Sequence, residues 1–222
     1  MSLVPSFPNF NGIAPLYDQL AKGVYGSAQL RAQQQYLASI PEHAQVLILG
    51  GGTGWILTEV LRLARPGHVL FLEASEKMVH LAKERLQKKS QSGLETQVEF
   101  RVGTEKDLGT EEKFHVVLTP FVLDLFAVEQ ARQMVQTLDQ HLLTGGLWLH
   151  TDFQESDSWF KKIWQQPLLW AMYRFFGWVS QVPARRLPLF RQLFQERGYT
   201  LEEETDFYGG FICAQQYRKP GP

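Results

Sequence analysis

Residues 46–55 read VLILGGGTGW, a short aliphatic run followed by four glycines within five positions and then a tryptophan. The aliphatic run predicts a buried strand, and the glycines predict a tight turn that opens a helix. Glycine tolerates positive φ and carries no Cβ, so a ligand can approach this backbone closely, beside the unpaired N–H groups of a helix N-terminus. Because a turn needed only for packing requires fewer glycines, the segment predicts a binding turn for a ribose or a carboxylate.

On both sides of this turn, short apolar runs alternate with amphipathic stretches. Strands are predicted over 45–49, 68–72, 98–102, 115–119 and 147–153, the last after a Gly145-Gly146 turn, and helices over 53–64, 75–87 and 128–142. Two β-rich runs flank Tyr208-Gly209-Gly210 and predict a C-terminal antiparallel hairpin. Strands that are apolar on both faces belong in a parallel sheet covered by helices, so we predict an α/β fold with a seven-stranded, mostly parallel sheet and helices on both faces.

Two helical segments are expected to cover this sheet within a single domain over 1–222. Residues 1–40 form a leader in which 14–39 favour helix, and Pro41 ends it. Residues 154–187, after the fifth strand, form a helical insertion rich in Trp, Tyr and Phe, with Trp170, Tyr173 and Phe176 among the side chains that could line a pocket. The excess of apolar side chains leaves four alternatives open for this insertion: a pocket cap, a homodimer seam, a membrane contact or ordinary packing.

Composition excludes several classes of function. The net charge of -1 provides no field that would gather nucleic acid, so no nucleic-acid partner is expected. Cys213 is the only cysteine, which rules out an intrachain disulfide, a zinc ribbon or a CxxC redox pair and fits a cytoplasmic protein. The first residues lack a basic, continuously apolar export signal, and the apolar run 168–179 is too short to span a bilayer.

The arrangement of the glycines indicates which nucleotide this turn binds. Dinucleotide enzymes use GxGxxG, but the third glycine position is occupied here by Trp55, and the pattern is GxGxG. Glu73 closes the second strand in the sequence FLEAS. With this order of elements, the chain resembles the class I S-adenosylmethionine-dependent methyltransferases, and its leader is similar to that of quinone-biosynthesis and small-molecule methyltransferases. The resemblance implies a Rossmann-like domain, S-adenosylmethionine as cofactor and a small methyl acceptor.

The resemblance also assigns residues to the cofactor. Glycines of the turn would line its methionine and ribose, Glu73 would accept hydrogen bonds from both ribose hydroxyls, and residues after Glu73 would pack against the adenine. The implied cofactor-binding residues are Gly50, Gly52, Gly54, Glu73, Ala74, Met78, Thr104, Glu105 and Thr119, with Tyr17 of the leader closing the site. Thr104, with Glu105 beside it, occupies the place of an acid that contacts the adenine amino group in the family, and Thr119 and Phe121 would form walls near the methyl group.

Two positions depart from the family pattern. Ile48 replaces an acid that orients the methionine end of the cofactor, and Thr104 replaces the acid near the adenine. These departures keep two alternatives open: a nucleotide-binding protein of the same fold without transferase activity, or an NAD(P)-dependent oxidoreductase. Trp55 at the third glycine position disfavours the oxidoreductase.

Candidate catalytic residues follow the fourth and fifth strands, where open α/β sheets bind their ligands. His150 and Asp152 share one face of the fifth strand, and either could act as a general base for methyl transfer to a small, apolar or aromatic acceptor. The alternative is that His150 belongs to the core and Asp152 caps a helix. Asp124 lies within the apolar run VLDLF and is either a helix cap or a site residue. No metal ion is expected.

Overall fold

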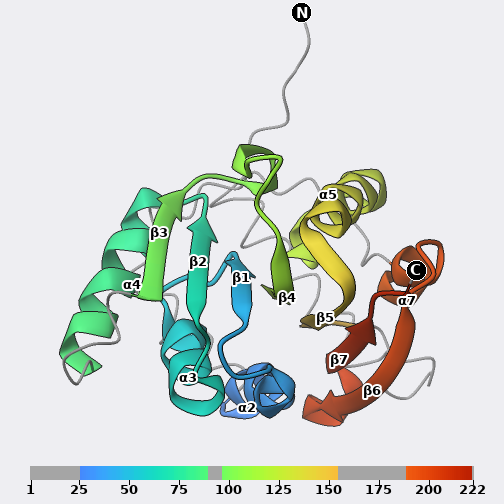
Figure 1. Ribbon diagram of the computed structural model, residues 1–222. Coiled ribbons are helices and arrows are strands. Elements are labelled where there is room, and N and C mark those ends of the chain that lie inside the picture. The colour runs from blue at the N-terminus through green and yellow to red at the C-terminus, as the bar shows by residue number, and fades with distance from the viewer. Residues whose placement is uncertain (1–25, 90–96, 155–188, 222) are drawn as a thin grey trace, which may run out of the picture.

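The computed structural model describes residues 26–89, 97–154 and 189–221 (Figure 1). Seven strands form one sheet in the order β3-β2-β1-β4-β5-β7-β6. Their bounds are β1 Gln45–Leu49, β2 His68–Glu73, β3 Val98–Val102, β4 Phe114–Pro120, β5 Leu142–Phe153, β6 Thr200–Phe207 and β7 Ile212–Arg218. Strands β1 to β5 pair in parallel, whereas β7 pairs antiparallel with both β5 and β6, which confirms the predicted sheet and its C-terminal hairpin.

Helices cover both faces of the sheet. The α-helices are α2 Ala28–Gln34, α3 Trp55–Ala64, α4 Glu76–Lys89, α5 Val128–His141 and α7 Phe190–Gln195, joined by the short 3-10 helices η1 Leu37–Ser39, η3 Glu105–Asp107, η4 Leu123–Leu125 and η5 Tyr208–Gly210. Alternate residues of each strand supply two apolar cores because successive side chains point to opposite faces. Val46 and Ile48 pack on the side of α3 and α4, whereas Leu47 and Leu49 pack on the side of α5 and α7.

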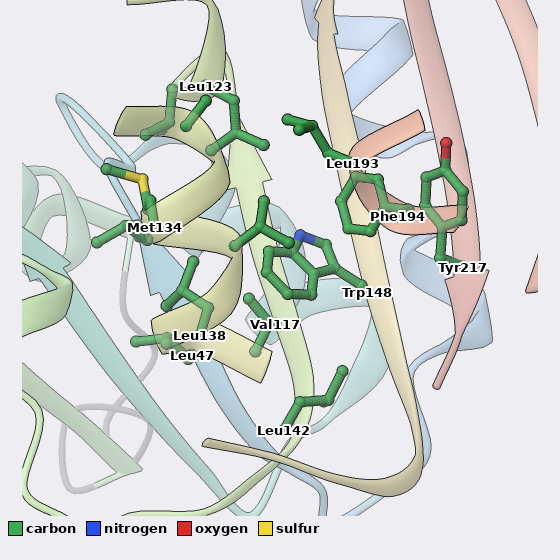
Figure 2. Close-up of a cluster of buried hydrophobic side chains, with 14 of the residues drawn as sticks. Leu47, Val117, Leu123, Met134, Leu138, Leu142, Trp148, Leu193, Phe194 and Tyr217 are labelled. Atoms are coloured by element: carbon green, nitrogen blue, oxygen red, sulfur yellow. The ribbon is translucent and has the colours of Figure 1, made fainter. Parts of the chain in front are cut away.

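Trp148 of β5 lies at the centre of the core beneath α5 and α7. Figure 2 shows its indole between the Met134 and Leu138 side of the cluster and the Phe194 and Tyr217 side. The edge of the indole meets the Phe194 ring at a centroid distance of 5.0 Å. This packing holds the C-terminal hairpin against the parallel part of the sheet.

The start of the fifth strand differs from the prediction. The strand begins at Leu142 and continues through Gly145 and Gly146, which were expected to form the turn before it. Pairing with β4 shifts register here, from Phe114 opposite Leu142 to Val116 opposite Leu147. Gly145 has a φ of 73°, so the two glycines form a bulge inside a longer strand.

Several predictions about the helical segments fall partly or wholly outside the described residues. Of the leader, α2 and η1 are described, and α2 packs against β6 and β7. Tyr17 and nearly all of the predicted insertion over 154–187, including its aromatic side chains, lie outside the described residues, so their capping role stays a prediction. Within the described ranges, no helix is both long enough and apolar enough to cross a membrane.

Candidate functional site

The glycine turn follows β1 and leads into α3 as predicted, but its glycines serve two different needs. A Cβ at Gly54 would lie 2.6 Å from the Cβ and 2.8 Å from the Cα of Ala82, so this glycine lets α3 approach α4. Added Cβ atoms at Gly50 and Gly51 would collide with Val122 and Phe71 respectively. A Cβ at Gly52 would meet no atom of the described residues within 4 Å. Internal packing therefore requires three of these glycines, and among the described residues nothing lies over the backbone of Gly52.

Glu73 joins the glycine turn to the turn after β2. Its Oε2 accepts a hydrogen bond from the Gly52 backbone N–H at 3.1 Å, and its Oε1 accepts one from the Ser75 N–H at 3.0 Å. Burial of the carboxyl raises the pKa of Glu73, while these backbone donors oppose that rise. A carboxylate has about four lone-pair sites, so both oxygens retain capacity to accept hydrogen bonds from a vicinal diol.

Thr104 and Glu105, two neighbouring candidates in the loop after β3, have different environments. Thr104 caps η3: its hydroxyl accepts from the Lys106 N–H, and its own N–H donates to Asp107 Oδ2 at 2.8 Å. Glu105 is buried, and its Oε2 has no hydrogen-bond partner among the described residues. Burial raises the pKa of Glu105. Glu105, rather than Thr104, thus holds the unsatisfied acceptor at this edge of the sheet.

The structure places the remaining cofactor candidates at different depths. Ala74 is half-buried between Glu73 and α4, and Met78 is buried on the core side of α4, where its N–H donates to Ser75 Oγ at 3.2 Å. Thr119 is fully buried inside β4. Ile48 is also fully buried, in the core beneath α3, so this position supplies no polar group to the site.

His150 lies in a closed aromatic environment beneath α7. Its Nδ1 hydrogen-bonds with Thr119 Oγ1 at 3.1 Å, and the same hydroxyl accepts a hydrogen bond from Trp148 Nε1 at 3.0 Å. The Phe190 ring lies 4.6 Å from the imidazole, centroid to centroid. Burial lowers the pKa of His150 to about 3, so the imidazole is neutral at physiological pH, and its Nε2 has no partner among the described residues.

Asp124 and Asp152 form a buried pair at the carboxyl ends of β4 and β5. Each side chain is 1% exposed, and Asp152 Oδ2 accepts a hydrogen bond from the Asp124 backbone N–H at 3.2 Å. The other oxygen of Asp152 accepts from the Phe153 N–H at 2.9 Å. Asp124 is inside η4, whose N-cap is Val122, so the interpretation of Asp124 as a helix cap is wrong.

Aromatic rings cover the opposite face of the same strand ends. Phe121 and Phe153 pack at 4.9 Å between centroids, and Phe153 and Phe211 at 5.2 Å. Phe121 has a φ of 55° and donates its N–H to the Thr151 carbonyl at 2.7 Å, so the chain reverses sharply after β4. Ala28 and Ala32 of α2 join this cluster, which brings part of the leader to the carboxyl ends of β4 and β5.

The predicted site residues that the structure describes therefore gather at the carboxyl edge of the sheet, but with unequal capacity to contact a ligand. Gly52, Glu73 and Glu105 present free backbone or acceptor capacity, whereas Thr104 and Thr119 use their hydroxyls inside the protein. The sequence had indicated Asp124 and Asp152 separately as candidates, but it did not predict that they lie together. The one local signal was that Asp124 is an acid in an apolar run directly after a strand.

Comparison with known proteins places the glycine turn, Glu73 and Glu105 within a recognised domain. Residues 46–146 match a family model described as a methyltransferase domain. A malonyl-[acyl-carrier protein] O-methyltransferase of Bacillus cereus is 25% identical over 164 residues, which cover 69% of this chain and 56% of that relative. The chain thus spans little more than half the length of the curated relative that it matches.

Solved structures with low sequence identity share the fold. The N-methyltransferase NodS of Bradyrhizobium japonicum in complex with S-adenosyl-L-homocysteine has a TM-score of 0.63 at 15% identity, over 86% of each chain. The [4+2]-cyclase SpnF has a TM-score of 0.66 at 13% identity, over 100% of each chain. Because one fold supports both activities, function must be argued from the residues of the site.

Proposed function

Because residues 46–146 match a methyltransferase domain, we propose that the chain is a class I S-adenosylmethionine-dependent methyltransferase that transfers a methyl group to a small, apolar or aromatic acceptor. The observation that carries the proposal is the Glu73 carboxylate, which bridges the Gly52 and Ser75 N–H groups beside open space over Gly52. This arrangement fits a ribose, since the carboxylate can accept from two adjacent hydroxyls while the bare glycine backbone leaves room for the ring.

Each part of the cofactor has a proposed set of residues. The backbone at Gly50, Gly52 and Gly54 would line the methionine and ribose, and Glu73 would hold the ribose hydroxyls. Ala74 and Met78 would pack beside the adenine. Glu105 would accept a hydrogen bond from the adenine amino group, because its buried Oε2 otherwise has no partner among the described residues.

The acceptor would lie beyond the ends of β4 and β5. When bound, S-adenosylmethionine supplies an electrophilic methyl group, and the protein contributes by alignment of the acceptor with that group. The rings of Phe121, Phe153 and Phe211 support an apolar or aromatic acceptor. Of the two predicted bases, His150 is the weaker, because burial lowers its pKa to about 3. Asp152 lies beside Asp124, and both oxygens of Asp152 already accept backbone N–H groups.

Ligand-dependent thermal stability tests the cofactor. We expect S-adenosyl-L-homocysteine at 100 times its Kd to stabilise the protein by about 2.7 kcal/mol, since a ligand that binds only the native state shifts the folding equilibrium by mass action. NAD and NADP at equal concentration should leave the melting temperature unchanged. A shift with NAD but none with S-adenosyl-L-homocysteine would overturn the proposal in favour of an oxidoreductase.

Glu105 can be tested with a cofactor analogue. S-inosyl-L-homocysteine carries a carbonyl oxygen in place of the adenine amino group and would face the Glu105 carboxylate without a donor. We expect the wild type to bind the analogue about 10-fold or more weakly than S-adenosyl-L-homocysteine, from the cost of an unmet hydrogen bond to a charged group. In Glu105→Gln this difference should shrink, because the amide can donate to the carbonyl. Equal discrimination by variant and wild type in calorimetric titrations would remove Glu105 from the adenine site.

A further inference from the structure

Unsatisfied polar atoms gather at the acceptor end of the sheet. Asp124 Oδ1 and His150 Nε2 are buried and have no hydrogen-bond partner among the described residues. They come from neighbouring strands: Asp124 follows β4, and His150 lies two residues before Asp152 on the same face of β5. Buried polar atoms are nearly always paired in proteins, so unpaired donors and acceptors at one edge indicate that a polar ligand completes the site.

The charge of the acid pair is not compensated by the protein around it. Burial raises the pKa of Asp124 to about 6 and that of Asp152 well above its usual range. Repulsion from the Asp124 carboxylate raises the pKa of Asp152 further. The other titratable side chains on this face of β5 and β7 are His150, Tyr217 and Cys213, which lies opposite Asp152 in the sheet. Burial raises the pKa of the Tyr217 hydroxyl, so this side chain carries no charge near neutral pH. His150 is neutral, and burial raises the pKa of the Cys213 thiol. In the described part of the chain, no cation offsets the pair.

A purely structural role explains this arrangement poorly. An isolated buried charge is expensive unless it is paired and hydrogen-bonded. A negative charge on one carboxyl disfavours ionisation of its neighbour, so the two groups do not ionise together readily. Oδ1 of Asp124 is the oxygen of this pair that the described protein leaves open.

We propose that Asp124 and Asp152 form one acid pair with a shared proton, and that this pair binds the attacking group of a methyl acceptor that carries a proton itself, a hydroxyl or an amine. The inference rests on the proposed methyl transfer and names its substrate class. A hydroxyl or an ammonium group donates a hydrogen bond to Asp124 Oδ1. An acceptor that attacks through an anionic carboxylate is excluded, because it would bring a second negative charge to the pair.

The same geometry accounts for the proton that such an acceptor must lose. The O–H or N–H bond breaks, its electron pair stays on the acceptor atom that bonds to the methyl group, and the proton joins the Asp124 carboxylate. The methyl–sulfur bond of the donor would break at the same time with its electron pair left on sulfur, so that the sulfonium leaves as the neutral thioether S-adenosyl-L-homocysteine. The pair is then fully protonated and neutral, and it returns one proton to water before the next turnover. His150 stays neutral throughout and serves to position the strand, since Thr119 and Phe190 hold its ring.

The experiment compares three probes of the same shape on protein saturated with S-adenosyl-L-homocysteine. Benzyl alcohol, benzylammonium and benzoate differ in the proton and charge that they present, and their Kd values are measured by calorimetry at pH 7. We expect benzoate to bind at least tenfold more weakly than either of the other two probes. In the double variant Asp124→Asn/Asp152→Asn, benzoate and benzyl alcohol should bind within about threefold of each other. Benzylammonium should likewise lose its advantage over benzoate.

Glu203→Gln is the matched control, because Glu203 is an exposed acid of β6 on the same sheet, and it should preserve the wild-type order of probes. Should the double variant unfold, the wild type labelled with ¹³C at the Asp carboxyls decides: two carboxyl signals must titrate in separate steps, one near pH 6 and both above the usual range of an Asp carboxyl. Equal binding of benzoate and benzyl alcohol, binding of none of the probes, or two carboxyls that titrate together near pH 4 would overturn the acid pair. A protein that S-adenosyl-L-homocysteine does not stabilise would instead contradict the proposed function itself.

Discussion

Glu73 makes two hydrogen bonds that only a carboxylate can make together. Both of its oxygens accept from backbone N–H groups, so the amide of Glu73→Gln would set an NH₂ group against either the Gly52 or the Ser75 N–H. We predict that this variant binds S-adenosyl-L-homocysteine about 10- to 100-fold more weakly, the range for one hydrogen bond to a charged group. Glu76→Gln, an exposed acid in the first turn of α4, should keep the wild-type Kd in the same titration.

The Asp124 carboxyl makes stability depend on pH in a direction opposite to that of most acids. Its pKa is raised to about 6 in the folded protein, from 3.8 when unfolded, so from about pH 4 to 6 the unfolded chain loses this proton while the folded chain keeps it. The free energy of unfolding therefore falls as pH rises through this window. Asp124→Asn removes the titration and can donate to Asp152, so we predict that it is about 1 to 3 kcal/mol more stable than the wild type at pH 7.

That gain should vanish near pH 4, where the Asp124 carboxyl is protonated in both states. Urea unfolding at a series of pH values measures the difference directly. A variant that is less stable than the wild type at pH 7 would mean that Asp124 is ionised and well stabilised in the folded protein, in conflict with an uncompensated pair.

In the β1–α3 turn, substitutions at two glycines should have different effects on stability and on ligand binding. Gly52 and Gly54 both have positive φ, at 57° and 81°, but only at Gly54 would a Cβ press on the Ala82 backbone. We predict that Gly54→Ala loses several kcal/mol of stability, because strain adds to overpacking between α3 and α4. Gly52→Ala should lose only about 1 to 2 kcal/mol from its backbone conformation.

Ligand affinity should show the reverse order. The Cβ of Gly52→Ala would enter the open space over the turn, so this variant should bind S-adenosyl-L-homocysteine more weakly than its small loss of stability suggests. Chemical denaturation measures the stability of Gly52→Ala and Gly54→Ala, and calorimetry measures their affinity for S-adenosyl-L-homocysteine. If Gly52→Ala binds the ligand like the wild type, the space above Gly52 is not the ribose site.

Across the whole molecule, the end of the chain fastens the hairpin to the parallel sheet. Lys219, which follows β7, donates from Nζ to the Leu142 carbonyl at 2.9 Å, to the Asp139 carbonyl, and pairs with Asp139 Oδ1 at 3.1 Å. Lys219→Met would leave these acceptors of α5 and β5 without their donor. We predict a loss of about 1 to 3 kcal/mol of unfolding free energy, the cost of unsatisfied buried acceptors.

Lys113→Met provides the comparison for Lys219→Met. Lys113 also donates to two carbonyls, those of Thr110 and Gln140, but in exposed positions. Water replaces such bonds, so this substitution should change stability by less than about 0.5 kcal/mol in the same denaturation experiment. If both substitutions lower the free energy of unfolding equally, the hydrogen bonds of Lys219 do not contribute more to stability than those of an exposed lysine.

Local patterns in the sequence were sufficient to predict most of the described strands and helices and their order along the chain. The predicted strands 45–49 and 98–102 match β1 and β3 residue for residue, because β-rich composition and flanking turn residues are properties of short segments. The glycine turn and Glu73 at the end of β2 were also predicted from the sequence, since each belongs to a short motif of neighbouring residues. The bulge at Gly145 was not, because glycines mark a turn and a bulge alike and only pairing with β4 distinguishes them.

What each glycine and acid does was decided by tertiary contacts. Gly54 and Gly52 look equivalent in the sequence, yet one meets Ala82 of another helix and the other meets open space. Asp124 and Asp152 stand 28 residues apart, and the parallel pairing of β4 with β5 brings them together. Whether a carboxyl holds its proton depends on burial and on the charges around it. Sequence pattern does not report these properties, because they arise from side chains that meet only when distant segments pack.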